Sequence, residues 1–213
     1  MNKKILVIAV HPDDETLGCG GTLFKHKDSG DEIYCVYVTN GSKIQEPMIS
    51  ELSNVYGFKE TMQLSFDEIK LADISLITII EKLSSAINRI QPNYMYIPNR
   101  SDAHSDHRRV FEALIACTKT FRYPFIKRIL MCEVISETDF VPALPENVFI
   151  PNVFVDISDF WEKKTKAIHI FESELLSAPF TRSINAIDAL SRYRGSQINA
   201  CYAEAFMLVK EVL

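Results

Sequence analysis

The sequence predicts an α/β fold, a Rossmann-like three-layer sandwich with helices on both faces of a mostly parallel central sheet. Strand-like runs alternate with helix-like patterns along the chain, which is typical of a parallel sheet covered on both faces. The run from Ile5 to Val10 is unbroken, apolar and rich in β-branched residues. Such a run indicates a central strand that is buried on both sides.

The other predicted elements follow in chain order. Glu32 to Thr39 and Tyr94 to Ile97 have the apolar and aromatic composition of further strands. Ser75 to Ile90 predicts a helix, because its isoleucines and Leu83 recur at the spacing of one helical face. The later elements are expected as a helix beginning near residue 104, strands at 127–135 and 153–157, and a helix at about 158–172.

Length and composition predict one domain. The chain has 213 residues and 47% hydrophobic content, which is enough to bury a large core. No internal repeat, low-complexity tract or linker-like composition interrupts it. We therefore expect a single domain over residues 1–213.

Composition also argues against several classes of function. The formal net charge of -5 gives no basic footprint for nucleic acid. No apolar run approaches the roughly 18 residues of a membrane span. The lysines and apolar run at the start imitate a secretory signal, but the run is too short and no small-residue cleavage site follows. The five cysteines are scattered and show no C-x-x-C spacing, which is typical of cysteines that stay reduced. These features predict a cytoplasmic protein.

A polar cluster, His11-Pro12-Asp13-Asp14-Glu15, directly follows the first predicted strand. In open α/β sheets, the loops that leave the carboxyl ends of parallel strands are where ligands bind. The alternative interpretation is a solvated turn whose carboxylates cap the start of a helix.

A second cluster, His104-Ser105-Asp106-His107, follows the strand predicted at Tyr94 to Ile97. The chain has five histidines, and three of them lie in these two clusters. Both clusters occupy the same topological position, directly after a strand. Together they predict a metal-assisted catalytic site.

The residue types suggest how such a site would work. A catalytic zinc ion normally takes three histidine or carboxylate ligands and leaves a fourth position for water, whose pKa falls to about 7. His11, Asp14 and His107 supply such a set. Adjacent side chains point in different directions, so Asp13 is expected to stay unligated and to act as general base.

Two further residues of the second cluster are candidates for catalysis. We expect His104 to stabilise the oxyanion of a tetrahedral intermediate or to protonate the leaving amine, and Asp106 to fix the tautomer of His104.

The two clusters resemble the signature of the PIG-L/LmbE family of zinc-dependent N-deacetylases. Thr39-Asn40-Gly41 and Tyr202-Ala203-Glu204-Ala205-Phe206 also resemble family positions. The resemblance implies an LmbE-like fold, hydrolysis of the acetamido group of an N-acetylglucosamine-type sugar, and zinc as the cofactor. It implies the same residue roles as above and, because relatives often form homo-oligomers, a possible homo-oligomer.

The chain also departs from the family pattern. Members that act on anionic glucosaminides commonly carry an arginine shortly after the second strand, whereas this chain has no arginine before Arg89. Lys43 is the candidate replacement, although lysine lacks the planar fork of arginine. Arg182 is a second candidate substrate contact, and the alternative for it is an exposed arginine that leads a helix.

Two other functions use the same ligand set. Two histidines and one carboxylate also form the facial triad of non-haem iron enzymes, but a spare carboxylate such as Asp13 has no use there. A non-catalytic module, in which a metal orders the loops around a sugar, would need neither Asp13 nor His104.

Overall fold

The central layer of the fold is a sheet whose strands lie in the order β3-β2-β1-β4-β5-β7-β6. The computed structural model describes residues 2–40 and 45–213. The strands are β1 (Lys4–Ala9), β2 (Glu32–Thr39), β3 (Glu60–Phe66), β4 (Tyr94–Ile97), β5 (Arg128–Cys132), β6 (Val153–Asp156) and β7 (Ala203–Glu211). The strands from β1 to β5 pair in parallel, and β7 pairs antiparallel with both β5 and β6.

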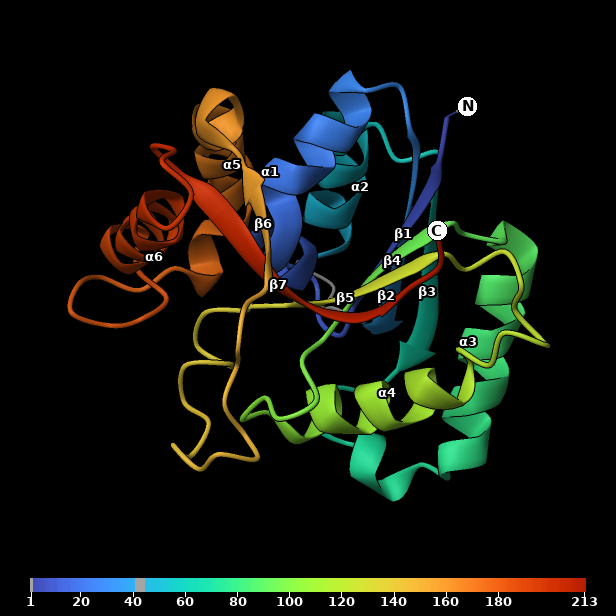
Figure 1. Cartoon of the computed structure of the whole chain (residues 1–213). Coiled ribbons are helices and arrows are strands. Elements are labelled where there is room, and N and C mark those ends of the chain that lie inside the picture. Colours follow the sequence, from blue (N-terminus) through green and yellow to red (C-terminus); the bar gives the residue numbers. More distant parts are fainter. Residues whose placement is uncertain (1, 41–44) are drawn as a thin grey trace.

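Helices cover both faces of this sheet (Figure 1). They are α1 (Asp14–Asp28), α2 (Glu46–Tyr56), α3 (Leu76–Ile90), α4 (Ser105–Ala116), α5 (Trp161–Ile168) and α6 (Ile184–Ser196), with short 3-10 helices η1 (Leu71–Asp73), η2 (Ser158–Phe160) and η3 (His169–Glu174). In Figure 1, α1, α2, α5 and α6 lie on one side of the sheet, and α3 and α4 lie on the other. The predicted α/β fold with a mostly parallel sheet is confirmed.

The first strand shows why the chain forms three layers. Ile5, Val7 and Ala9 pack in the hydrophobic cluster under α1 and α2, whereas Leu6 and Ile8 pack in the cluster under α3 and α4. Successive side chains of a strand point to opposite faces. Because every residue of this run is apolar, both faces of β1 are buried.

Helix α1 is broken in its middle and held by a buried ion pair. Cys19 has non-helical dihedral angles, so the helix begins again after it. The carboxylate of Glu204, on β7, accepts hydrogen bonds from the amides of Gly21 and Thr22, both at 2.8 Å. Lys164 donates to Glu204 Oε1 at 2.7 Å and to the carbonyl of Leu17 at 3.0 Å. Glu204 thereby acts as a cap for the second half of α1.

Some elements differ from the prediction. Residues 158–172 were expected as one helix, but they form η2, α5 and the first part of η3, and Phe171 inside η3 has non-helical dihedral angles. Elements α2, β3, α6 and β7 were not predicted as such. None of the described helices is long and apolar enough to cross a membrane.

Candidate active site

The two predicted polar clusters meet at one edge of the sheet. Residues 10–13 form the turn between β1 and α1, and residues 98–104 connect β4 to α4. Strands β1 and β4 are parallel neighbours, so both connections leave the sheet at the same edge. His104 is the N-cap of α4, which places His107 in the first turn of that helix.

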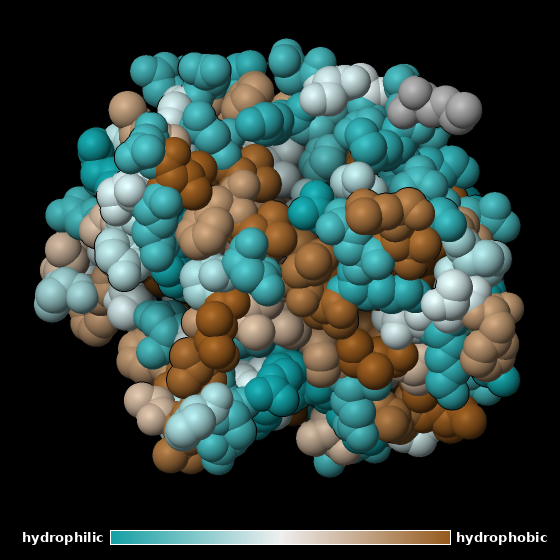
Figure 2. Space-filling view, in the orientation of Figure 1, coloured by the Kyte–Doolittle hydropathy of each residue, from teal (hydrophilic) through white to brown (hydrophobic). Residues whose placement is uncertain are grey.

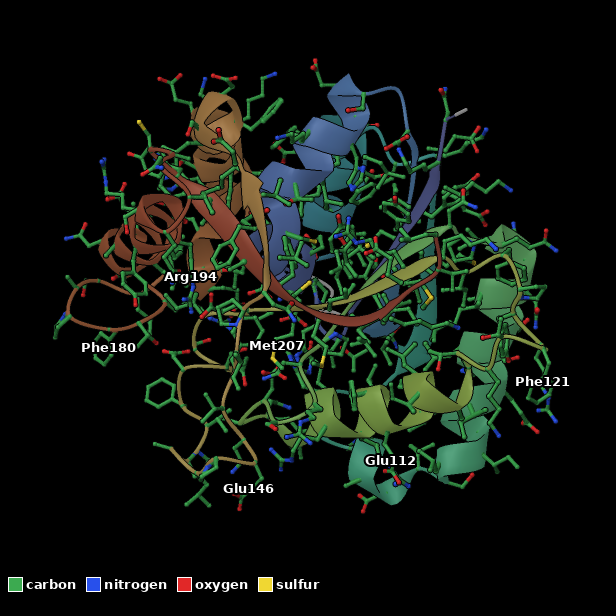
Figure 3. The ribbon with its side chains drawn as sticks, viewed as in Figure 1. Glu112, Phe121, Glu146, Phe180, Arg194 and Met207 are labelled. Atoms are coloured by element: carbon green, nitrogen blue, oxygen red, sulfur yellow. The ribbon has the colours of Figure 1, made fainter. Side chains whose placement is uncertain are left out.

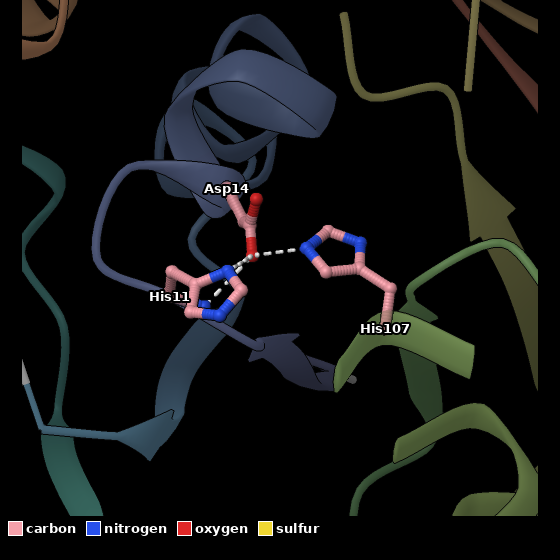
Figure 4. A group of neighbouring side chains, drawn as sticks. All are labelled: His11, Asp14 and His107. Carbon is pink, nitrogen blue, oxygen red and sulfur yellow. Dashed lines mark hydrogen bonds and ion pairs between the residues drawn. The ribbon is translucent and has the colours of Figure 1, made fainter. Parts of the chain in front are cut away.

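His11, Asp14 and His107 come together at this edge (Figure 4). One ligand atom from each lies within 4.8 Å of the others. Asp14 Oδ2 is 3.3 Å from His107 Nε2 and 3.9 Å from His11 Nδ1. The side chains of Asp14 and His107 are buried, and that of His11 is partly exposed. The described part of the chain therefore holds the donor set that the sequence predicted for a metal.

The orientation of His107 fits a cation at this position. Its Nδ1 lies 2.8 Å from Asp102 Oδ2, and a carboxylate can only accept, so Nδ1 carries the proton. Nε2 is buried, makes no hydrogen bond within the part of the chain that the structure describes, and faces the Asp14 carboxylate. Two electron-pair donors that face each other across 3.3 Å need a positive charge between them.

The pKa shifts of His107 and Asp14 also indicate that a positive charge is stabilised between these two side chains. Burial acts to lower the pKa of His107, but the carboxylates of Asp14 and Asp102 outweigh it and raise this pKa well above its usual value. Burial acts to raise the pKa of Asp14, but His107 and His11 bring it well below its usual range. A proton or a metal cation on this pair satisfies both residues.

Asp102 is a site residue that the sequence analysis missed. It is fully buried, and its second oxygen accepts a hydrogen bond from Thr138 Oγ1 at 2.7 Å. A histidine that binds a metal usually donates its other ring N–H to a carboxylate or carbonyl. The aspartate that precedes the second cluster in the same loop was the available signal.

The role expected for Asp106 differs in the structure. Its Oδ2 accepts from the amide of Ile69 at 2.7 Å and lies 3.3 Å from His11 Nε2, so its carboxylate orients His11. The expected partner, His104, instead accepts a hydrogen bond on Nδ1 from the backbone amide of Asp106 at 3.1 Å. The neutral His104 ring therefore carries its proton on Nε2. Asp106 still sets the tautomer of His104, but through its main chain.

Asp13 has an unusual backbone conformation. Its φ is 115°, in the region that favours glycine, and a non-glycine residue there costs roughly 1 to 3 kcal/mol. Such strain is concentrated at functional sites. Burial raises the pKa of Asp13, and the Arg182 guanidinium opposes that shift. A carboxylate with a raised pKa is suited to accept a proton near neutral pH.

Arg182 reaches the site from the segment before α6. Its Nη1 lies 3.1 Å from Asp13 Oδ2, and its Nε donates to Ser136 Oγ at 3.0 Å. Glu174 and Glu137 lie 3.7 and 3.8 Å from the guanidinium. The side chain is only 20% exposed. The alternative of an exposed, helix-leading arginine is therefore wrong, whereas the predicted substrate contact stays a prediction. Lys43, the other candidate contact, lies outside the described residues.

A cavity of about 290 Å³ opens beside these residues and is called the inner cavity here. Its lining includes His11, Asp13, His104 and Arg182. Glu68 and Glu137 also line it, and burial raises the pKa of both. The sequence analysis missed these two glutamates because they lie in loops outside both clusters.

The chain is similar to known proteins over its whole length. Residues 6–118 match the model of the family PIG-L, described as GlcNAc-PI de-N-acetylase. The diacetylchitobiose deacetylase of Thermococcus kodakarensis is 25% identical over 232 aligned positions, which cover 97% of this chain and 83% of the relative. The uncharacterized deacetylase YaiS of Escherichia coli is 30% identical, with 68% of this chain and 82% of the relative covered. The crystal structure of a conserved protein from Thermus thermophilus, TT1542, superposes with a TM-score of 0.79 and 27% identity, covering 99% of this chain and 96% of the other.

Proposed function

This chain belongs to the PIG-L family, and from that membership and its site we propose that it is a metal-dependent hydrolase that removes the N-acetyl group from an N-acetylglucosamine-type sugar. The observation that carries the proposal is the convergence of His11, Asp14 and His107 at one sheet edge. Asp13 and His104 line the cavity beside them. We take residues 1–213 as one domain for this function, because strands from β1 to β7 pair in one sheet.

His11, Asp14 and His107 would hold the metal, for which we propose zinc. Two imidazole nitrogens and one carboxylate oxygen form a ligand set of the catalytic zinc type. When bound, such an ion acts as a Lewis acid and lowers the pKa of a coordinated water to about 7. Asp102 and Asp106 would orient the two imidazoles, since each carboxylate contacts one ring nitrogen.

Asp13 is the proposed general base. Its carboxylate lines the inner cavity and lies outside the donor set of His11, Asp14 and His107. It would accept the proton of the water that attacks the amide carbonyl. Arg182 would hold this carboxylate in place through its 3.1 Å contact, and we retain it as a substrate contact as well.

His104 is proposed to donate from Nε2 to the substrate. Burial and the neighbouring His11 lower the pKa of His104, which favours the neutral ring. Because Nδ1 accepts the Asp106 amide, the ring N–H is on Nε2. That N–H would stabilise the oxyanion or reach the leaving amine.

We expect His104→Ala to lower kcat by about 10²- to 10³-fold, because an oxyanion donor is lost while the metal ligands stay. Steady-state acetate release gives kcat and KM separately. His169→Ala, which removes an exposed histidine of η3, is the matched control and should keep kcat. A change of KM alone in His104→Ala would make this residue a binding group instead.

Acetate release with and without metal tests the proposed function directly. The substrates are free N-acetylglucosamine, an aryl N-acetylglucosaminide and N-acetylglucosamine 1-phosphate. We expect release from at least one sugar, its loss after treatment with a chelator, and recovery when zinc is added back. Full activity in the stripped protein would contradict the metal-dependent mechanism.

The same preparations separate the other two candidate functions. A non-haem iron enzyme would need O₂ and added Fe²⁺, so deacetylation under anaerobic conditions argues against it. A binding module would bind sugar without releasing acetate from any of the three substrates.

A further inference from the structure

A second and larger cavity adjoins the inner cavity. It has a volume of about 590 Å³ and is called the outer cavity here. Glu137, Glu174 and Arg182 line both cavities, so these three residues form the boundary between them. A group that is joined to a sugar in the inner cavity would therefore extend across this boundary into the outer cavity.

The outer cavity has an apolar wall built by two loops. Phe140 comes from the connection between β5 and β6, and Leu176, Pro179 and Phe180 come from the connection between η3 and α6. In Figure 1 the first connection lies at the lower left and the second lies at the left, above it, and Figure 3 labels Phe180 on the second. Residues of both line the outer cavity. In Figure 2, hydrophobic residues are interspersed with hydrophilic ones over this part of the surface.

The aromatic side chains of this wall are exposed to solvent. Phe140 is 63% exposed and Phe180 is 58% exposed. Single exposed apolar residues are common, but a group of them that lines a cavity marks a binding surface. Both rings can gain hydrophobic free energy by covering a flat apolar face of a ligand.

The charges at the boundary between the two cavities determine which kind of group can bind across it. The Arg182 guanidinium is within 4 Å of three carboxylates, those of Asp13, Glu137 and Glu174. Its positive charge is therefore already matched. Among the described residues at this boundary, an anionic group would approach three carboxylates and one guanidinium and would be repelled. A neutral group meets no such penalty.

We propose that the outer cavity binds the aglycone of the substrate, that this aglycone is neutral with an apolar face, and that Phe140 and Phe180 determine the preference for it. Aryl groups and the apolar face of a second sugar ring share this chemistry. The inference rests on the proposed deacetylase function and specifies its substrate class.

The test compares three sugars: free N-acetylglucosamine, phenyl N-acetyl-β-glucosaminide and N-acetylglucosamine 1-phosphate. We expect kcat/KM to be about tenfold higher for the phenyl glycoside than for the free sugar, since one aromatic contact is worth up to roughly this factor. The 1-phosphate should be the poorest of the three. A disaccharide of N-acetylglucosamine then shows whether a second sugar ring replaces the phenyl group.

The variants Phe180→Ala and Phe140→Ala should bring the ratio of kcat/KM for the phenyl glycoside to kcat/KM for the free sugar close to one. Phe121→Ala is the matched control, because Phe121 is also exposed, at 77%, but lies between α4 and β5 on the other side of the molecule (Figure 3). This control should keep the ratio. A ratio near one in the unmodified protein, or preference for the 1-phosphate, would overturn the inference.

Calorimetry with the same sugars separates the two proposals. If no sugar releases acetate but the phenyl glycoside binds more tightly than the free sugar, the proposed deacetylase function is wrong. The proposal that the outer cavity binds the group attached to the sugar is then still supported. If acetate is released and both sugars bind and react equally, the proposed function stands and the outer cavity does not select the aglycone.

Discussion

Asp13→Asn is expected to lower kcat for acetate release by about 10²- to 10⁴-fold, the range that a lost general base produces. Asparagine has nearly the same shape, and its carbonyl oxygen can still accept from Arg182 Nη1, as the carboxylate does at 3.1 Å. It cannot take up a proton from water. The three proposed metal ligands are unchanged, so the metal content should stay the same.

Kinetics and metal analysis on the same preparation check this expectation. Asp28→Asn is the matched control, because Asp28 is an exposed aspartate at the far end of α1, and it should behave as the unmodified protein. If Asp13→Asn loses its metal, Asp13 is a ligand. If kcat is unchanged, another group is the base.

Glu204→Gln is expected to lower the free energy of unfolding by about 3 to 5 kcal/mol, because removing one partner of a buried ion pair leaves the other charge uncompensated. Glu204 and Lys164 are 4% and 2% exposed. Glutamine also offers a single acceptor oxygen, where the carboxylate accepts from the two amides of Gly21 and Thr22 and from Lys164.

Urea unfolding of three variants tests this expectation. The double variant Lys164→Met with Glu204→Gln should lose less stability than Glu204→Gln alone, since it leaves no unpaired buried ammonium. Arg192→Met breaks an ion pair with Asp188 whose arginine is 58% exposed, and should cost at most about 1 kcal/mol. Equal stability of Glu204→Gln and the unmodified protein would show that the buried pair contributes nothing.

The parts of the site that the sequence predicted are those fixed by local position. His11 and Asp14 follow a strand that is recognisable from its apolar run, and His107 lies in the first turn of a helix after another strand. Parallel neighbouring strands then bring such residues to one edge. Their meeting also requires that β1 and β4 are neighbours in the sheet, which the structure shows.

The parts that were missed depend on contacts between distant segments. Glu137 lines the inner cavity from the connection after β5. The 3.1 Å contact of Arg182 with Asp13 links residues that are 169 positions apart in the sequence. No spacing rule relates such positions. The backbone bond between Asp106 and His104 was missed for another reason: side-chain chemistry alone suggests a carboxylate pair, and the helix N-cap geometry decides otherwise.

The same distinction applies to the fold. Strands β2 and β4 were predicted with the bounds they have, because they are apolar and lie in the buried part of the sheet. Strand β3, at the edge of the sheet, is mostly polar and only partly buried, so its sequence carries a weak signal. The cytoplasmic location and a homo-oligomer stay predictions.

The placement of β7 between β5 and β6 has a consequence for synthesis on the ribosome. All three proposed metal ligands leave the exit tunnel before Glu204, the residue that caps the second half of α1. Until β7 arrives, the nascent polypeptide has an open edge at β5, which is prone to pairing with other chains. If translation stalled before residue 203, the product would contain all three proposed metal ligands. Its helix α1 would lack the hydrogen bonds from the amides of Gly21 and Thr22 to Glu204.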